Sequence, residues 1–300
     1  MSVPEGATAP APRTVGEWWQ AIERRFGTAR LAYGHGTQNA RDEAAWLVCH
    51  VLRLPFDDLS GGLSRPVNPS AARRLTTLAK RRIETRKPLA YLLREAWLHG
   101  RRFEVDSRVI VPRSHIAELL PDALAPWFTR RAPKRILDLC TGSGCLAILV
   151  ALAYGRAHVD AADVSSPALA VARRNVAAYR LGRRIRLMRS DVFRGLRESR
   201  YDLIVCNPPY VPARDMARLP PEFRHEPALA LASGRDGLDF VRRLLAEAAR
   251  HLTRAGVLVV EVGDARQAVE RAFPDTAFTW LETAAGVAPV FAITAGEIRT

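Results

Sequence analysis

The sequence lacks several features that define whole classes of protein. No apolar run approaches the ~18 residues that a membrane-spanning helix needs, and the longest covers only residues 145–154. The first ten residues hold no apolar stretch typical of a secretion signal. Cysteine is scarce, at four in 300 residues, which is too few for a disulfide framework and shows no zinc-ligand spacing. These absences predict a soluble, cytoplasmic protein with reduced thiols and no membrane partner.

Lysine is also scarce, although the chain is strongly basic. Lys+Arg number 45 against 31 Asp+Glu, a net charge of +14, and the only lysines are Lys80, Lys87 and Lys134. Arginine pairs well with phosphate, so the charge predicts a polyanionic partner. GC-rich codon usage would place the same arginines on a solvated surface. On charge alone both interpretations stay open, and much of the excess lies in residues 65–102 and 173–200.

The first third of the chain predicts a short tail and a small helical domain. Residues 1–13 are rich in proline and alanine and are expected to be disordered. Thr14 and Asn39 are candidate N-caps before stretches with apolar residues at helical spacing, and a third helix is expected from Ser70 to about Arg86. No strand pattern interrupts them, so residues 14–88 are interpreted as one helical domain.

Residues 89–112 change character and predict a linker. The stretch from Glu95 to Asp106 has the pattern of a β-hairpin that turns near Gly100. Ser114 is a candidate cap for a helix that continues through Leu124. A second domain is therefore expected to occupy residues 113–300.

From Arg135 the pattern alternates between strands and helices. Parallel sheets covered on both faces show this alternation, so the prediction is an α/β fold with a seven-stranded, mostly parallel sheet. The expected helices are 145–154, 167–179 and 237–252, and the expected strands are 135–140, 157–163, 185–190, 201–206, 257–261, 277–281 and 290–294.

A glycine-containing loop follows the first of these strands. Asp138 lies near the end of the strand, which closes at Cys140, and the loop Thr141-Gly142-Ser143-Gly144 leads into an apolar helix. Gly142 and Gly144 permit tight turns and close approach of a ligand to the backbone. The loop lacks both the G-x-G-x-x-G pattern and a following G-K-[ST], which disfavours nucleotide phosphates. A ligand carboxylate is the alternative anion, and an ordinary strand-to-helix turn remains the structural interpretation.

Two acidic residues end the next two strands. Asp163 stands 25 residues after Asp138, the place from which a carboxylate binds ribose hydroxyls in open α/β folds. Asp191 ends the third strand, from which it would contact the edge of a base. Either residue alone is commonly a turn former, but together with the loop they predict a nucleoside-containing ligand.

The tetrapeptide Asn207-Pro208-Pro209-Tyr210 directly follows the fourth strand and is the most specific feature. The prolines remove two N–H donors and restrict φ, so that carbonyl oxygens, notably that of Pro208, are available as acceptors. Asn207 adds a side-chain acceptor and Tyr210 a flat wall. A planar NH₂ group would donate one proton to each acceptor and keep its lone pair toward an electrophile. The histidines show no metal-ligand spacing, and no metal site is predicted.

These residues resemble the Rossmann-like class I S-adenosylmethionine-dependent methyltransferases, and more narrowly the protein-glutamine N(5)-methyltransferases. The resemblance extends from about residue 14 to the end and includes Val109-Ile-Val-Pro-Arg-Ser. It implies S-adenosylmethionine as cofactor and a substrate-recognition role for the helical domain. It assigns Asn207, Pro208, Pro209 and Tyr210 to the target amide, and assigns to the cofactor Asp138, Cys140, Thr141, Gly142, Ser143, Gly144, Asp163, Asp191, Val192 and Asn207.

Two branches of this family and one other class compete for the substrate. Residues 219–239 and 260–263 are similar to the branch that methylates a glutamine of the third large-subunit ribosomal protein. Release-factor methyltransferases usually carry Pro after the Arg113 equivalent, where this chain has Ser114. A nucleic-acid adenine methyltransferase would also suit N-P-P-Y and the charge. The ribosomal-protein branch is the preferred hypothesis, with weak rRNA or assembly-intermediate contact as the functional interpretation of the charge.

Overall fold

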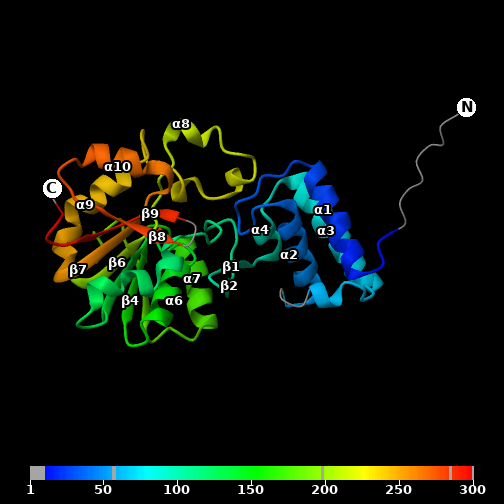
Figure 1. The fold of residues 1–300 in the computed structure, drawn as a ribbon, viewed down its shortest axis with the longest axis horizontal. Helices are drawn as coiled ribbons and strands as arrows, with labels where there is room; N and C mark the ends of the chain where they lie inside the picture. Colours follow the sequence, from blue (N-terminus) through cyan, green and yellow to red (C-terminus); the bar gives the residue numbers. More distant parts are fainter. Residues whose placement is uncertain (1–10, 56–58, 197–198, 284–285, 299–300) are drawn as a thin grey trace, which may run out of the picture. The chain divides into compact units, whose positions relative to one another are not determined.

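The structure is a computed structural model, and it describes residues 11–55, 59–196, 199–283 and 286–298. The chain divides into two compact units, Met1–Leu93 and Arg94–Thr300, called here the helical unit and the sheet unit (Figure 1). Most of the tail expected over residues 1–13 lies outside the described residues. In the described ranges no helix is long and apolar enough to cross a membrane.

In its described residues the helical unit contains four α-helices, with caps that the sequence largely predicts. Thr14 caps the first in a capping box with Glu17, and Asn39 caps the second. The third begins at Pro69 behind the cap Asn68, and not at Ser70 as expected, because proline suits the first helical turn. The elements are α1 (Val15–Thr28), α2 (Ala40–Leu52), η2 (Ser60–Gly62), α3 (Pro69–Thr85) and α4 (Leu89–Leu93).

A buried ion pair joins α2 to α3 inside this apolar bundle. The guanidinium of Arg82 is fully buried and lies 3.3 Å from both carboxylate oxygens of Glu43. Its Nη2 also donates to the carbonyl of Ala32. Removal of one partner would leave a buried charge uncompensated, so this pair fixes how the two helices meet.

The sheet unit begins with the expected hairpin. Strands β1 (Ala96–Leu98) and β2 (Arg101–Phe103) pair antiparallel around His99 and Gly100, which both have positive φ. The helix expected from Ser114 through Leu124 is wrong in its extent. Pro121 breaks it into α5 (Ile116–Leu119) and the 3₁₀ segment η3 (Asp122–Phe128), because proline cannot continue an α-helix interior.

The seven-stranded, mostly parallel sheet is confirmed. Its strand order is β5-β4-β3-β6-β7-β9-β8, with β9 antiparallel to both of its neighbours. The strands are β3 (Arg135–Leu139), β4 (His158–Asp163), β5 (Ile185–Arg189), β6 (Tyr201–Cys206), β7 (Leu252–Glu261), β8 (Thr279–Thr283) and β9 (Gly286–Thr294).

Helices cover both faces of this sheet (Figure 1). One apolar cluster packs α5, α6 (Cys145–Ala153) and α7 (Ser166–Ala178) on one face. Another packs α9 (Asp239–His251) and α10 (Arg266–Ala272) on the other face. Between β6 and α9 the chain forms α8 (Ala213–Met216), η4 (Phe223–His225) and η5 (Ala228–Ala230), and η6 (Gly263–Ala265) follows β7.

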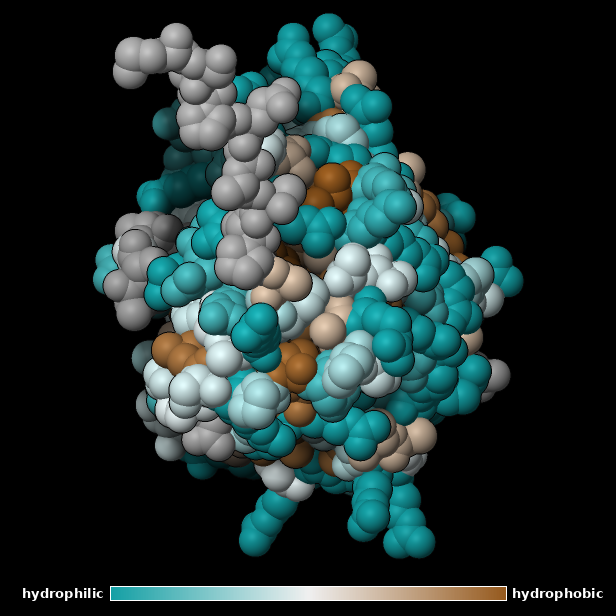
Figure 2. Space-filling model, turned by 90° about the vertical axis from the view of Figure 1, so that its right-hand side faces the viewer, coloured by the Kyte–Doolittle hydropathy of each residue, from teal (hydrophilic) through white to brown (hydrophobic). Residues whose placement is uncertain are grey.

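The parallel strands β5, β4, β3 and β6 give the sheet two chemically different edges. All four begin at one edge, called here the amino edge, and end at the opposite carboxyl edge. Open α/β sheets bind ligands at the carboxyl edge. The molecular face in Figure 2 is largely hydrophilic, with hydrophobic residues in small separate groups, so no broad apolar patch competes there with the sheet edge as a candidate site.

Candidate active site

A cavity of about 390 Å³ lies at the carboxyl edge of β3, β4, β5 and β6. It falls within the size range of small-molecule sites. Its walls come from five segments of the sheet unit: the loop after β3, the end of β4, the end of β5, the segment from β6 into α9, and residues 108–110. Sequence-predicted residues on the wall are Cys140, Gly142, Asp163, Asp191, Val192, Asn207 and Pro209.

The loop after β3 turns sharply beneath this cavity. Cys140, Gly142 and Gly144 all have positive φ, and the amide of Gly144 donates to the carbonyl of Thr141. A Cβ at Gly144 would lie 3.2 Å from Cβ of Ala172, so both its conformation and its contact with α7 favour glycine. Thr141, Ser143 and Gly144 support this turn and do not line the cavity.

Asp138 holds the loop from below and is fully buried. Its Oδ2 accepts from the Thr141 hydroxyl at 2.5 Å and from the Ala147 amide at 2.9 Å. Burial raises the pKa of this carboxyl to about 7, against these bonds, which lower it. The folded state therefore binds a proton that the unfolded chain releases near pH 4, and this contribution to stability is lost as pH rises toward 7. Asp138 is a structural support rather than a wall residue.

Asp163 presents hydrogen-bond acceptors at the cavity wall. Its Oδ2 accepts from the Gly142 amide at 2.9 Å, and its Oδ1 accepts from the Ser165 amide at 2.8 Å. Burial raises the pKa of this carboxyl, although the backbone amides lower it. Each oxygen keeps a further acceptor position, so the carboxylate is fixed by the loop and still presents acceptors to the cavity.

Asp191 and Val192 border the cavity on the side of α9. The Asp191 carboxylate pairs with Arg243 of α9 at 2.7 Å, a contact that the sequence did not suggest. Val192 adopts φ of +50°, which is strained for a β-branched residue and is held by the hydrogen bond from Ser190 Oγ to its carbonyl. Val192 supplies no ring, but Phe240 of α9 lines the same cavity and provides an aromatic surface.

The N-P-P-Y turn follows β6 and faces the cavity with Asn207 and Pro209. The Asn207 Nδ2 donates to the Arg113 carbonyl at 3.3 Å, which orients the amide and leaves Oδ1 as an acceptor for a ligand. Pro208 is buried beneath the turn. The ring of Tyr210 lies over Gly263, where a Cβ would come within 2.5 Å of Cε2. Burial raises the pKa of Tyr210 to about 12, so its hydroxyl stays neutral.

Two buried carboxylates brace the segment that carries Arg113. Glu226 accepts hydrogen bonds from both terminal nitrogens of Arg113 at 2.6 Å, and another from the backbone amide of Val111. Glu261 accepts the Ser114 hydroxyl at 2.6 Å and the His115 amide, and its burial raises the carboxyl pKa. These contacts fix the position of the Arg113 carbonyl, which accepts from Asn207. Arg113 and Glu226 therefore orient the Asn207 side chain without lining the cavity themselves.

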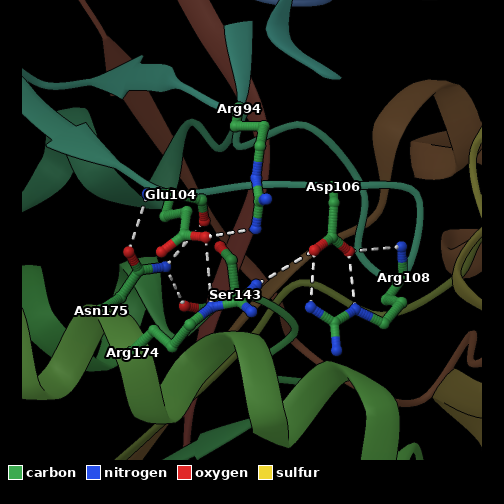
Figure 3. Close-up of polar contacts among 7 residues, drawn as sticks. All are labelled: Arg94, Glu104, Asp106, Arg108, Ser143, Arg174 and Asn175. Atoms are coloured by element: carbon green, nitrogen blue, oxygen red, sulfur yellow. Dashed lines mark hydrogen bonds and ion pairs between the residues drawn. The ribbon is translucent and has the colours of Figure 1, made fainter. Parts of the chain in front are cut away.

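Residues 104–108 are held against α7 and the loop after β3 by a polar network (Figure 3). The buried amide of Asn175 accepts from the Glu104 amide at 2.7 Å and donates to the carbonyls of Glu104 and Ser143. Arg174 pairs with Glu104 and Asp106, and Asp106 also accepts from Arg108. This network places residues 108–110 on the cavity wall.

The sequence missed three parts of this site: residues 108–110, Asn175 and the α9 residues Phe240 and Arg243. All come from segments far from the recognised turns. Asn175 carried one detectable signal, because it lies among apolar residues on the buried face of α7, and a buried amide must find hydrogen-bond partners. In the described ranges no group of three or more His, Cys, Asp or Glu side chains is arranged to hold a metal ion.

The fold and this edge define a class of enzyme. A sheet of this order, with a turn-rich loop after the first strand and acids after the second and third, is that of the class I methyltransferases. The Methyltransferase small domain family matches residues 119–234, and the PrmC N-terminal domain family matches residues 17–93. The catalytic domain of hMettl16, solved in complex with the MAT2A 3'UTR hairpin 1, superposes with a TM-score of 0.50 at 16% identity, over 79% of this chain and 84% of that chain, and supports the fold alone.

Curated relatives narrow the class. The ribosomal protein uL3 glutamine methyltransferase of Bordetella pertussis is 54% identical over 92% of this chain and 93% of its own length. Those of Burkholderia pseudomallei and Neisseria meningitidis serogroup A are 49% and 50% identical, covering 97% and 91% of this chain and 98% and 90% of their own lengths. The chain belongs to the family of ribosomal protein uL3 glutamine methyltransferases. It is an enzyme that uses S-adenosylmethionine as methyl donor, as the resemblance predicted.

Proposed function

We propose that the chain methylates the side-chain amide nitrogen, N(5), of a glutamine in ribosomal protein uL3. The names of its relatives supply this substrate. The observation that carries the chemistry is the orientation of Asn207, whose Nδ2 is committed to Arg113 while Oδ1 remains an acceptor beside the cavity. An NH₂ group is the ligand that such an acceptor, together with the Pro208 carbonyl, would bind.

The residues of the cavity suit the donor, and each takes a proposed role. Asp163 would accept the ribose hydroxyls. Cys140 and Gly142 would contact the amino-acid end, and Thr141, Ser143 and Gly144 would hold the turn behind them. Asp191, Val192 and Phe240 would border the adenine. The bound donor supplies an electrophilic methyl group. Asn207 and Pro208 would orient the amide lone pair toward it, and the positioned acceptors with exclusion of water would provide most of the acceleration.

Tyr210 would form a wall beside the target amide and would not act as a base. Its raised pKa keeps the phenol protonated at neutral pH. No base is needed before attack, because the amide nitrogen becomes strongly acidic only after it has gained the methyl group. The proton can then leave to water.

The helical unit is proposed to recognise the substrate protein. It contributes none of the described residues that line the cavity, and the PrmC N-terminal domain match covers almost all of it. We further propose that the enzyme acts in the cytoplasm, where ribosomal proteins are assembled, and that it contacts rRNA or an assembly intermediate.

Mass spectrometry of ribosomal proteins and release factors from cells lacking this chain tests the substrate. We expect uL3 to lose the mass of one methyl group at a single glutamine, and release factors to keep theirs. Restoration by the wild-type chain but not by Asn207→Ala would tie the loss to this site. Loss of methylation from a release factor, or from nucleic acid alone, would refute the proposed substrate.

A further inference from the structure

The amino edge of the sheet, opposite the cavity, gathers exposed cations. Strands β3 and β4 begin side by side, with Arg135 opposite His158, and β5 begins beside Val159. Each of these strand starts carries or follows basic residues. The basic edge is defined here as Lys134, Arg135, Arg156, Arg180, Arg183, Arg184 and Arg186. A hollow of about 650 Å³ lies among them, lined by Arg135, Arg183, Arg184 and Arg186 and by His158, Asp160 and Tyr201.

Some of these cations are held rigidly by the protein. Arg186 forms two bonds of 2.8 Å with the Asp160 carboxylate, which also accepts the Tyr201 hydroxyl. Arg135 lies over the Tyr201 ring, 5.7 Å from its centroid. Arg184 donates to carbonyls at the end of α6, including that of Tyr154. These three side chains are therefore ordered before any ligand arrives, which lowers the entropy lost on binding.

The remaining members have no carboxylate partner in the described part of the chain. Lys134, Arg156, Arg180 and Arg183 are exposed, and none forms an ion pair there. Two carboxylates at these strand starts already have partners. Asp160 accepts from Arg186, and Asp202 accepts from the backbone amides of Lys134 and Arg135. A row of unpaired cations remains, and self-repulsion in such a row favours an anionic partner.

We propose that the basic edge binds the phosphate backbone of RNA. The starts of β3, β4 and β5 span two strand spacings of ~4.8 Å, on the order of 10 Å, and this length suits neighbouring phosphates of one chain better than a single small anion. The guanidinium groups offer paired donors for phosphate oxygens. The row lies at the opposite end of the strands from the cavity, so bound RNA would leave the methyl-transfer site open. This inference rests on the rRNA contact proposed above and assigns that contact to a surface.

Anisotropy of a fluorescent 20-nucleotide RNA, measured across a series of salt concentrations, tests this surface. The variant is the triple substitution Arg156→Gln, Arg180→Gln and Arg183→Gln. The matched control removes the same charge at exposed positions elsewhere, through Arg24→Gln, Arg25→Gln and Arg271→Gln. We expect the basic-edge variant to bind at least tenfold more weakly at low salt. Its log-log salt slope should fall by about 2 to 3, since each phosphate contact contributes roughly 0.7–0.9.

The control should keep the slope of the wild-type protein. Equal losses in both triple variants would show a net-charge effect and overturn the proposal, as would absence of RNA binding by the wild type. Binding to phosphatidylserine-containing vesicles in preference to RNA would overturn it in favour of a lipid surface. Titration with S-adenosylhomocysteine should give unchanged affinity in both variants, which shows that they are folded. Methylation of free uL3 is assayed separately. If uL3 proves not to be the substrate, the RNA-binding result can still be interpreted.

Discussion

The two edges of the sheet differ in how their arginines are paired. At the carboxyl edge the arginines meet carboxylates: Arg243 pairs with Asp191, Arg242 with Asp236 and Arg108 with Asp106. At the amino edge Arg186 pairs with Asp160, but Arg156, Arg180 and Arg183 are exposed without such partners in the described ranges. Paired arginines therefore help to shape the cavity at the carboxyl edge, whereas unpaired arginines produce a positive potential at the amino edge. Net charge summed over the chain conceals this difference.

The two edges also differ in how their interactions respond to salt. The proposed ligand specificity at the carboxyl edge depends on buried acceptors whose geometry is fixed by backbone amides, as for Asp163. Interactions of this kind resist screening by salt, whereas exposed cations at the amino edge are screened within about 10 Å at 0.1 M salt. Substitutions at the carboxyl edge should therefore change turnover or cofactor affinity at every salt concentration. Substitutions at the amino edge should act only through salt-sensitive binding.

The largest effect is expected at the N-P-P-Y turn. Asn207→Ala removes the side-chain acceptor that would orient the target amide, and we expect turnover to fall by roughly 100- to 1000-fold. Cofactor affinity should stay within about threefold of wild type, because Asp163 and the loop after β3 are untouched. Transfer of a radiolabelled methyl group to uL3 measures the first quantity and calorimetry the second. Near-normal turnover would show that Asn207 does not hold the substrate.

A smaller effect is expected from a pair of substitutions on one strand. Asp163 ends β4 at the carboxyl edge, whereas Asp160 lies three residues earlier and pairs with Arg186 near the amino edge. Asp163→Ala should weaken S-adenosylhomocysteine binding by about 10- to 100-fold, the size expected for lost hydrogen bonds to a charged group. Asp160→Asn should leave that affinity unchanged. Equal affinities in the two variants, measured by calorimetry, would contradict the proposed ribose-binding role.

Much of this arrangement was predictable because its determinants are local. The strand-loop-helix alternation located the sheet, and Asp163, Asp191 and Asn207 each follow a recognisable strand. Local rules also failed where a neighbouring residue mattered more, as when Pro121 divided the helix expected from Ser114. These residues line or border one cavity because parallel strands end at one edge, a consequence of topology that the alternation already implies.

The rest of the site was not predictable because it depends on contacts distant in sequence. Arg113 meets Glu226, and Glu261 meets Ser114, across more than a hundred residues. No periodicity or turn signal links such positions in a single sequence. For the same reason the sequence could not predict which arginines form ion pairs. The charge window 173–200 includes both Arg174, which is paired near the cavity, and Arg183, which belongs to the basic edge.

The smallest of these effects would sharpen the comparison by contrasting neighbouring residues of α7. Asn175→Asp replaces the NH₂ that bonds the carbonyls of Glu104 and Ser143 with an oxygen that repels them, inside a buried site. We expect the loss of these two hydrogen bonds to weaken cofactor binding by about 1–2 kcal/mol, which should raise KM for S-adenosylmethionine by about 5- to 30-fold. The chemical step should change little, because Asn207 keeps its own support.

The control is the neighbouring variant Arg174→Gln. It removes only half-exposed ion pairs with Glu104 and Asp106, which contribute little to stability in water. It should therefore leave KM within about twofold. A general loss of folding would lower the fraction of active enzyme, and hence kcat, in proportion for either variant. A rise in KM confined to Asn175→Asp, measured with folded protein, would instead identify the buried amide as the residue that holds the 108–110 wall in place. Equal KM values for the two variants would show that the wall does not depend on it.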